Sequence, residues 1–199
     1  MISVTTEHVF KKEIKTMKKI ALATVLALVV GSASAVEVRL EGQDANGKSG
    51  TAGQTVYELG IKESINKNFA GDFVIKNYRT DNTNTLSTRY EAGLTASNTY
   101  GMVTPFARVA VGEKYVSGAS GYSYYSVEPG VATALGNVTA SLGWRYQDSF
   151  SDSHNDQTRT WRSKLGYNVT KSDNIYIGYD VQRGDSNQNI TKVGYVHRF

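Results

Sequence analysis

Alternation of apolar and polar residues with a period of two runs through most of this 199-residue chain. The stretch 36–43 reads VEVRLEGQ, in which Val36, Val38 and Leu40 alternate with charged residues. Because successive side chains of a β-strand point to opposite faces, this spacing predicts a strand with one apolar and one polar side.

The same pattern recurs along the rest of the chain, and no segment shows the spacing of an amphipathic helix. We therefore predict an all-β fold of about ten strands, with eight or twelve as alternatives. The least regular segment is 70–80, which carries apolar residues on both faces. The predicted strands are 36–43, 55–65, 70–80, 86–96, 101–115, 122–135, 138–147, 158–170, 174–183 and 189–199.

The predicted connections alternate in length. Longer connections, such as DANGKSGTAG at 44–53, alternate along the chain with short connections, such as GN at 136–137. A meander with longer loops at one end and short turns at the other is typical of an outer-membrane barrel. Strands of about ten to twelve residues, tilted by about 40°, rise by about 27 Å, close to the apolar band of such barrels.

Glycine placement indicates which face lies inside. A concave wall is crowded, so the face that carries small residues is the expected interior, and here that face is the polar one. The opposite face is apolar, with aromatics near the strand ends where a membrane girdle would place them. We therefore expect the apolar face outside, whereas a soluble barrel, the alternative, would bury it. The polar-face glycines are Gly60, Gly93, Gly112, Gly130, Gly143, Gly166, Gly178 and Gly194.

Residues 17–35, MKKIALATVLALVVGSASA, have the pattern of a secretory signal. Lys18 and Lys19 precede an apolar run at 20–30, and small residues lead up to Ala35. That run is short for a membrane span. We predict a cleavable signal peptide with an N-terminal extension at 1–35 and an outer-membrane β-barrel at 36–199.

Charge and composition exclude several classes of function. The net charge of +4 falls largely on the predicted signal, since 36–199 carries 17 basic and 16 acidic residues. A nearly neutral barrel domain gives no reason to expect a nucleic-acid partner. The chain has no cysteine, which excludes disulfides and thiolate chemistry.

The signal, the strand meander and the final stretch NITKVGYVHRF together resemble the small outer-membrane β-barrel proteins of Gram-negative bacteria, of the porin and opacity-protein type. The resemblance implies a barrel surrounded by outer-membrane lipid. It also implies that the barrel-assembly machinery reads the last strand through Val193, Tyr195 and Phe199. His197 departs from the apolar residue usual at its position, and we expect it at the membrane edge.

Two prolines fit a closed barrel imperfectly. Pro105 and Pro129 fall within predicted strands, and each removes one donor from the hydrogen-bond ladder. We predict a local irregularity, such as a bulge, where they lie nearly level on adjacent strands.

The polar face would bring charged side chains into the lumen, and two interpretations are open. The charges could pair across strands and fill a narrow barrel, or a slight basic excess could line a path for small anionic solutes. The expected lumen is rich in arginine, and in this respect it is similar to that of the oligogalacturonate-specific porins. The similarity favours the interpretation as a path for anionic solutes. The expected lumen residues are Glu37, Arg39, Glu41, Glu58, Lys62, Arg89, Glu91, Arg108, Glu128, Arg145, Arg162, Lys164, Asp180 and Lys192.

We find no catalytic constellation, metal-ligand spacing or cofactor motif, so we predict neither an enzyme nor a cofactor. His154 lies between Asp152 and Asp156, but in a polar stretch typical of a solvated loop. The prediction is a small passive pore or a structural barrel.

The alternative is a cell-surface adhesin that acts through its loops. The tripeptide Arg183-Gly184-Asp185 resembles an integrin-recognition sequence, although Gly-Asp-Ser-Asn is also ordinary turn chemistry.

Overall fold

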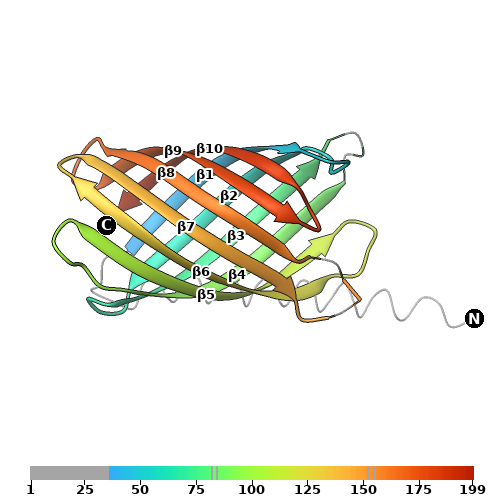
Figure 1. Ribbon diagram of the computed structural model, residues 1–199, viewed down its shortest axis with the longest axis horizontal. Helices are drawn as coiled ribbons and strands as arrows, with labels where there is room; N and C mark the ends of the chain where they lie inside the picture. The colour runs from blue at the N-terminus through green and yellow to red at the C-terminus, as the bar shows by residue number, and fades with distance from the viewer. Residues whose placement is uncertain (1–35, 82, 84, 152, 155) are drawn as a thin grey trace, which may run out of the picture. The chain divides into compact units, whose positions relative to one another are not determined.

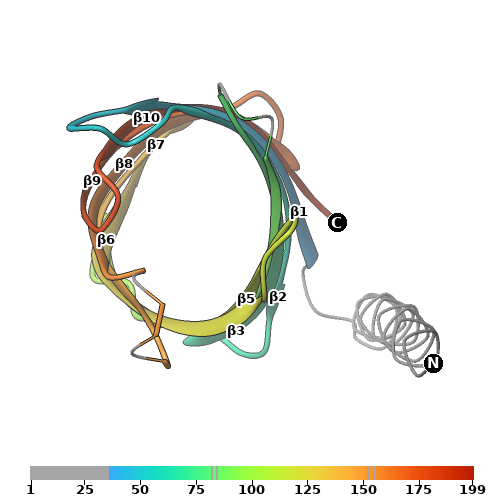
Figure 2. The ribbon, with the colours of Figure 1, turned by 90° about the vertical axis from the view of Figure 1, so that its right-hand side faces the viewer.

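The computed structural model describes residues 36–81, 83, 85–151, 153–154 and 156–199. The predicted signal peptide and Asp152 lie outside these residues. Ten antiparallel strands follow one another around a closed barrel (Figures 1 and 2). The strands are β1 (Val36–Gly47), β2 (Gln54–Ser64), β3 (Phe69–Thr80), β4 (Leu86–Ser97), β5 (Val103–Val116), β6 (Tyr122–Leu135), β7 (Val138–Ser149), β8 (Thr158–Asn168), β9 (Asp173–Gly184) and β10 (Gln188–Arg198).

Each strand pairs with its neighbours in sequence, and β10 pairs with β1 to close the sheet. The backbone N–H of Phe199 donates to the carbonyl of Val36 at 2.9 Å and extends this seam to the end of the barrel. The predicted ten-strand antiparallel up-and-down barrel is confirmed. No helix among the described residues is long and apolar enough to cross a bilayer.

The strand register sets the width of the barrel. Following paired residues once around the sheet returns to β1 displaced by about 12 residues. For ten strands this shear corresponds to a tilt of about 42° and a Cα radius of about 10 Å. Long side chains from opposite walls can meet across an interior of that width.

The outer face of the barrel is an exposed apolar surface. Side chains such as Leu40, Leu165 and Val193 are 53%, 53% and 64% exposed, although they lie in the middle of paired strands. Aromatic residues lie nearer the strand ends, where Tyr90 contacts Tyr115 edge to face with ring centroids 6.0 Å apart. The expectation that the apolar face is outside is therefore correct.

Interior glycines make room for large side chains on neighbouring strands. A Cβ on Gly112 would lie 2.6 Å from the ring of Tyr124, and one on Gly194 would lie 2.2 Å from the ring of Tyr176. Both tyrosines are buried. The glycines thus allow bulky groups to cross the inner wall.

The two prolines behave differently. Pairing of β6 with β7 stops after Val127 and resumes at Gly130 in the same register, so Pro129 interrupts the ladder without a bulge. The pairing of β4 with β5 ends at Ser97 and Phe106. Pro105 lies beyond this last pair, so β4 needs no backbone donor from it. The predicted irregularity is correct at Pro129 and wrong at Pro105.

The connections differ less in length than the sequence suggests, because β1 extends to Gly47. We call the two ends of the barrel the loop end and the turn end. Connections 48–53, 81–85, 117–121, 150–157 and 185–187 lie at the loop end. Connections 65–68, 98–102, 136–137 and 169–172 lie at the turn end.

The outer band yields a prediction about membrane insertion. Replacing Leu165 by arginine places a charge on the outer face of β8, which also carries Trp161 and Tyr167. We expect this change to lower the free energy of unfolding from lipid vesicles by about 2–4 kcal/mol, since charge at the bilayer midplane is costly. Denaturant unfolding measures the difference.

Asn46→Arg is the matched control, because Asn46 is exposed at the loop end of β1. The expected cost there is about 0–1 kcal/mol. Equal costs at the two positions would contradict an apolar band that spans the membrane.

Candidate functional site

The interior of the barrel holds two cavities. A turn-side cavity of about 310 Å³ extends toward the turn end, and a loop-side cavity of about 160 Å³ extends toward the loop end. Glu41, also expected in the lumen, is buried. The other expected lumen residues line the turn-side cavity (Glu37, Arg39, Glu58, Lys62, Glu91, Arg108, Glu128, Arg145, Arg162 and Lys164) or the loop-side cavity (Arg89, Arg145, Arg162, Asp180 and Lys192).

Charged side chains that contact one another separate the two cavities. Lys76, Arg145 and Arg162 line both cavities and therefore lie between them. We call the ion-paired group around these three residues the central cluster. It consists of Arg39, Glu58, Asp72, Lys76, Glu91, Arg108, Glu128, Arg145, Arg162, Asp180 and Lys192.

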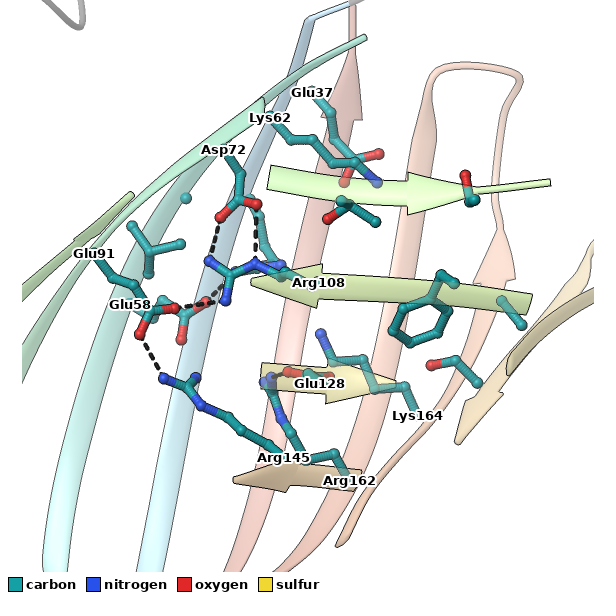
Figure 3. A pocket seen from close by; sticks show the side chains of 18 of the residues that line it. Glu37, Glu58, Lys62, Asp72, Glu91, Arg108, Glu128, Arg145, Arg162 and Lys164 are labelled. Atoms are coloured by element: carbon teal, nitrogen blue, oxygen red, sulfur yellow. Dashed lines mark hydrogen bonds and ion pairs between the residues drawn. The ribbon is translucent and has the colours of Figure 1, made fainter. Parts of the chain in front are cut away.

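Glu91 on β4 joins parts of the wall that lie three strands apart. Its carboxylate accepts hydrogen bonds from Arg108 at 2.7 Å and from Arg145 at 2.5 Å (Figure 3). The Tyr124 hydroxyl also donates to it, at 3.0 Å. Because Arg145 comes from β7, with β5 and β6 between it and β4, this ion pair crosses the interior. Arg108 also donates to both oxygens of Asp72, at 2.9 and 2.5 Å.

A second group forms around Glu58 on β2. Its carboxylate pairs with Arg39 on β1 and with Lys76 on β3, the latter at 2.6 Å. Gln43 donates to both Glu58 and the neighbouring Glu41, so the amide links two buried carboxylates.

The third group of ion pairs forms around Arg162 on β8. Arg162 pairs with Glu128 at 2.6 Å and with Asp180 at 3.3 Å, and Asp180 also pairs with Lys192. These contacts link β6, β8, β9 and β10. The central cluster therefore spans the lumen by paired charges rather than by apolar packing.

Cations outnumber carboxylates along both cavities. Lys62 has no ion-pair partner within the described part of the chain, and Lys164 is 3.8 Å from Glu41. The cations are Arg39, Lys62, Lys76, Arg108, Arg145, Arg162 and Lys164 on the turn side and Lys76, Arg89, Lys114, Arg145, Arg162 and Lys192 on the loop side. The carboxylates are Glu37, Glu58, Asp72, Glu91 and Glu128 on the turn side and Asp156, Asp180 and Asp185 on the loop side.

Sequence reasoning missed several charged lining residues. Asp72 and Lys76 lie on β3, whose two mixed faces hid which residues point inward. Lys114 has the same strand parity as Arg108, so the alternation of β5 could have identified it. Asp156 enters from a connection, for which strand periodicity gives no signal.

The two histidines of the barrel form no catalytic arrangement among the described residues. His154 contacts the Ser153 hydroxyl at 3.0 Å and stacks on Tyr122, with ring centroids 4.6 Å apart. His197 contacts Asp173 at 2.8 Å, and its ring lies against Phe199. The described residues contain no group of three or more side chains suited to a metal ion.

The Arg183-Gly184-Asp185 tripeptide is held within the loop end. Asp185 accepts a hydrogen bond from the backbone of Gln157 at 2.7 Å, and Arg183 donates to Asn189 at 3.2 Å. Both charged groups therefore have partners in the barrel, although both residues are exposed.

No protein-family model and no curated protein matches the chain. Among solved structures, an outer membrane channel from Pseudomonas putida F1 superposes with a TM-score of 0.50 at 9% identity, covering 84% of this chain and 96% of that one. The NanC porin gives 0.47 at 12% identity, covering 84% and 100%. The KdgM porin in complex with disordered oligogalacturonate gives 0.45 at 13%, covering 83% and 99%. These likenesses concern the fold, and the chain has the fold of an outer-membrane β-barrel.

Proposed function

We propose that this protein spans the outer membrane and provides a narrow passage that favours small anions. The observation that carries the proposal is that two cavities with excess cations meet at the central cluster, where Lys76, Arg145 and Arg162 line both. A positive lining concentrates anions in a water-filled path.

The central cluster limits the size of what can pass. Glu91 and Arg145 meet across the interior at 2.5 Å, so a large solute would have to separate buried ion pairs. Breaking such a pair without replacing its partner costs about 3–5 kcal/mol. The Nε atoms of Arg39, Arg89 and Arg145 are buried and have no hydrogen-bond partner among the described residues. A small anion that enters the cluster would therefore find donors that no carboxylate occupies.

Delivery and assembly belong to the same proposal. Val193, Tyr195 and Phe199 lie on the outer face at β10 and its end, and Phe199 is 77% exposed. We propose that the barrel-assembly machinery reads these residues before β10 pairs with β1. A signal peptide at 1–35 would bring the chain to that machinery.

Planar-bilayer recording of the refolded protein tests the passage directly. We expect small single-channel steps and a reversal potential in a KCl gradient that indicates preference for chloride, because cations exceed carboxylates along both cavities. Correctly folded protein without channel openings would favour a structural barrel. A preference for potassium would contradict the proposed role of the lining.

Glu91→Gln tests the role of the central cluster. The change removes a carboxylate that binds Arg108 and Arg145. Among the described residues, the buried Arg145 then has no ion-pair partner, and Arg108 keeps only Asp72. We expect the free energy of unfolding to fall by about 3 kcal/mol and chloride selectivity to rise. Denaturant unfolding and reversal potentials measure the two effects.

Glu113→Gln is the control, because Glu113 is an exposed carboxylate on β5 that accepts a hydrogen bond from Tyr115. It removes the same charge from the same protein and should leave chloride selectivity unchanged. If both variants shift selectivity equally, overall charge rather than the lumen determines it.

A further inference from the structure

Asp156 is a carboxylate of the loop-side cavity that belongs to a connection rather than to a strand. Asp156 lies between β7 and β8, yet it is only 5% exposed. Its carboxylate is 3.2 Å from Arg89, 3.6 Å from Lys114 and 2.5 Å from the Gln147 amide. These three side chains come from β4, β5 and β7, so the barrel wall supplies every one of these contacts.

Aromatic rings accompany the two cations. The Arg89 guanidinium lies 5.1 Å from the ring centroid of Tyr78 and 5.4 Å from that of Tyr124, and the Lys114 ammonium lies 5.4 Å from that of Tyr122. Such contacts stabilise a cation over a ring face without neutralising it.

Asp156 is therefore the charge partner on which this site depends. Among the described residues, Arg89 and Lys114 form ion pairs with no other carboxylate. The site offers a guanidinium, an ammonium and an amide N–H, a combination that suits the two oxygens of a carboxylate. The adjoining cavity of about 160 Å³ leaves space for the rest of a small molecule.

We propose that Arg89, Lys114 and Gln147 form a binding site for the carboxylate group of a small solute that enters at the loop end, and that Asp156 is its intramolecular competitor. This inference rests on the proposed anion passage and names the solute class. A tethered group acts at an effective concentration on the order of millimolar. A free carboxylate therefore has to approach that concentration before it replaces Asp156.

Acetate binding to the native protein, Asp156→Gly and Asp81→Gly in detergent tests the site. The readout is the shift in thermal unfolding temperature with sodium acetate, compared with sodium chloride at equal ionic strength. We expect acetate to stabilise Asp156→Gly at concentrations about tenfold lower than it stabilises the native protein, because the tethered competitor is gone.

Asp81→Gly is the matched control, because Asp81 is an exposed carboxylate that directly follows β3 at the loop end and lines neither cavity. It should respond to acetate as the native protein does. Equal responses of all three proteins, or equal effects of acetate and chloride on Asp156→Gly, would overturn the proposed site.

Asp156→Asn provides a second variant of nearly the same shape, should the glycine variant not fold. It leaves Arg89 and Lys114 without their carboxylate, so we expect chloride conductance to increase about twofold in planar bilayers. Conductance and selectivity equal to those of the native protein would contradict the site. Because the thermal shift needs no open channel, a protein without openings would count against the passage but not against acetate binding.

Discussion

Pairing of buried charge across the lumen is the interaction on which the interior of this barrel depends. Glu91 is 3% exposed and receives hydrogen bonds from two arginines on different parts of the wall. An isolated carboxylate in that position would carry a large desolvation cost. The register of the ten strands places the two arginines within reach of Glu91. The geometry of the sheet therefore decides which buried charges can pair, and this pairing offsets their desolvation cost.

The same strands present an apolar face to the outside of the barrel and a face of small, aromatic and charged residues to the lumen. Outside, apolar side chains are exposed over the middle of the barrel, which suits lipid rather than water. Inside, small residues such as Gly112 and Gly194 lie beneath the rings of Tyr124 and Tyr176. This arrangement lets aromatic and charged side chains fill a lumen with a Cα radius of about 10 Å.

The sequence predicts the barrel and much of its lining because strand alternation encodes both. Arg108, Arg145 and Asp180 have the parity of interior residues and line the cavities. Alternation fails on β3, where Asp72 and Val74 share the inner face and the outer residues include Asn77 and Arg79.

Partner choice and connections carry no comparable signal. Nothing in the local pattern shows that Glu91 contacts Arg145 three strands away, since that contact depends on barrel closure and shear. In the sequence, Asp156 stands out only by its position near His154. In the structure it contacts Arg89 and Lys114 inside the barrel. Residues that enter the lumen from connections are therefore found only from the three-dimensional arrangement.

The central claim is that the cluster divides the lumen, and cysteine accessibility tests it most directly because the chain has no native cysteine. Ser186→Cys places a thiol in the loop-side cavity and Ser141→Cys places one in the turn-side cavity. A membrane-impermeant thiol reagent applied at the loop end should label Ser186→Cys quickly and Ser141→Cys slowly, and adding Glu91→Gln should accelerate the latter. Equally fast labelling of both thiols in the otherwise native protein would contradict the account.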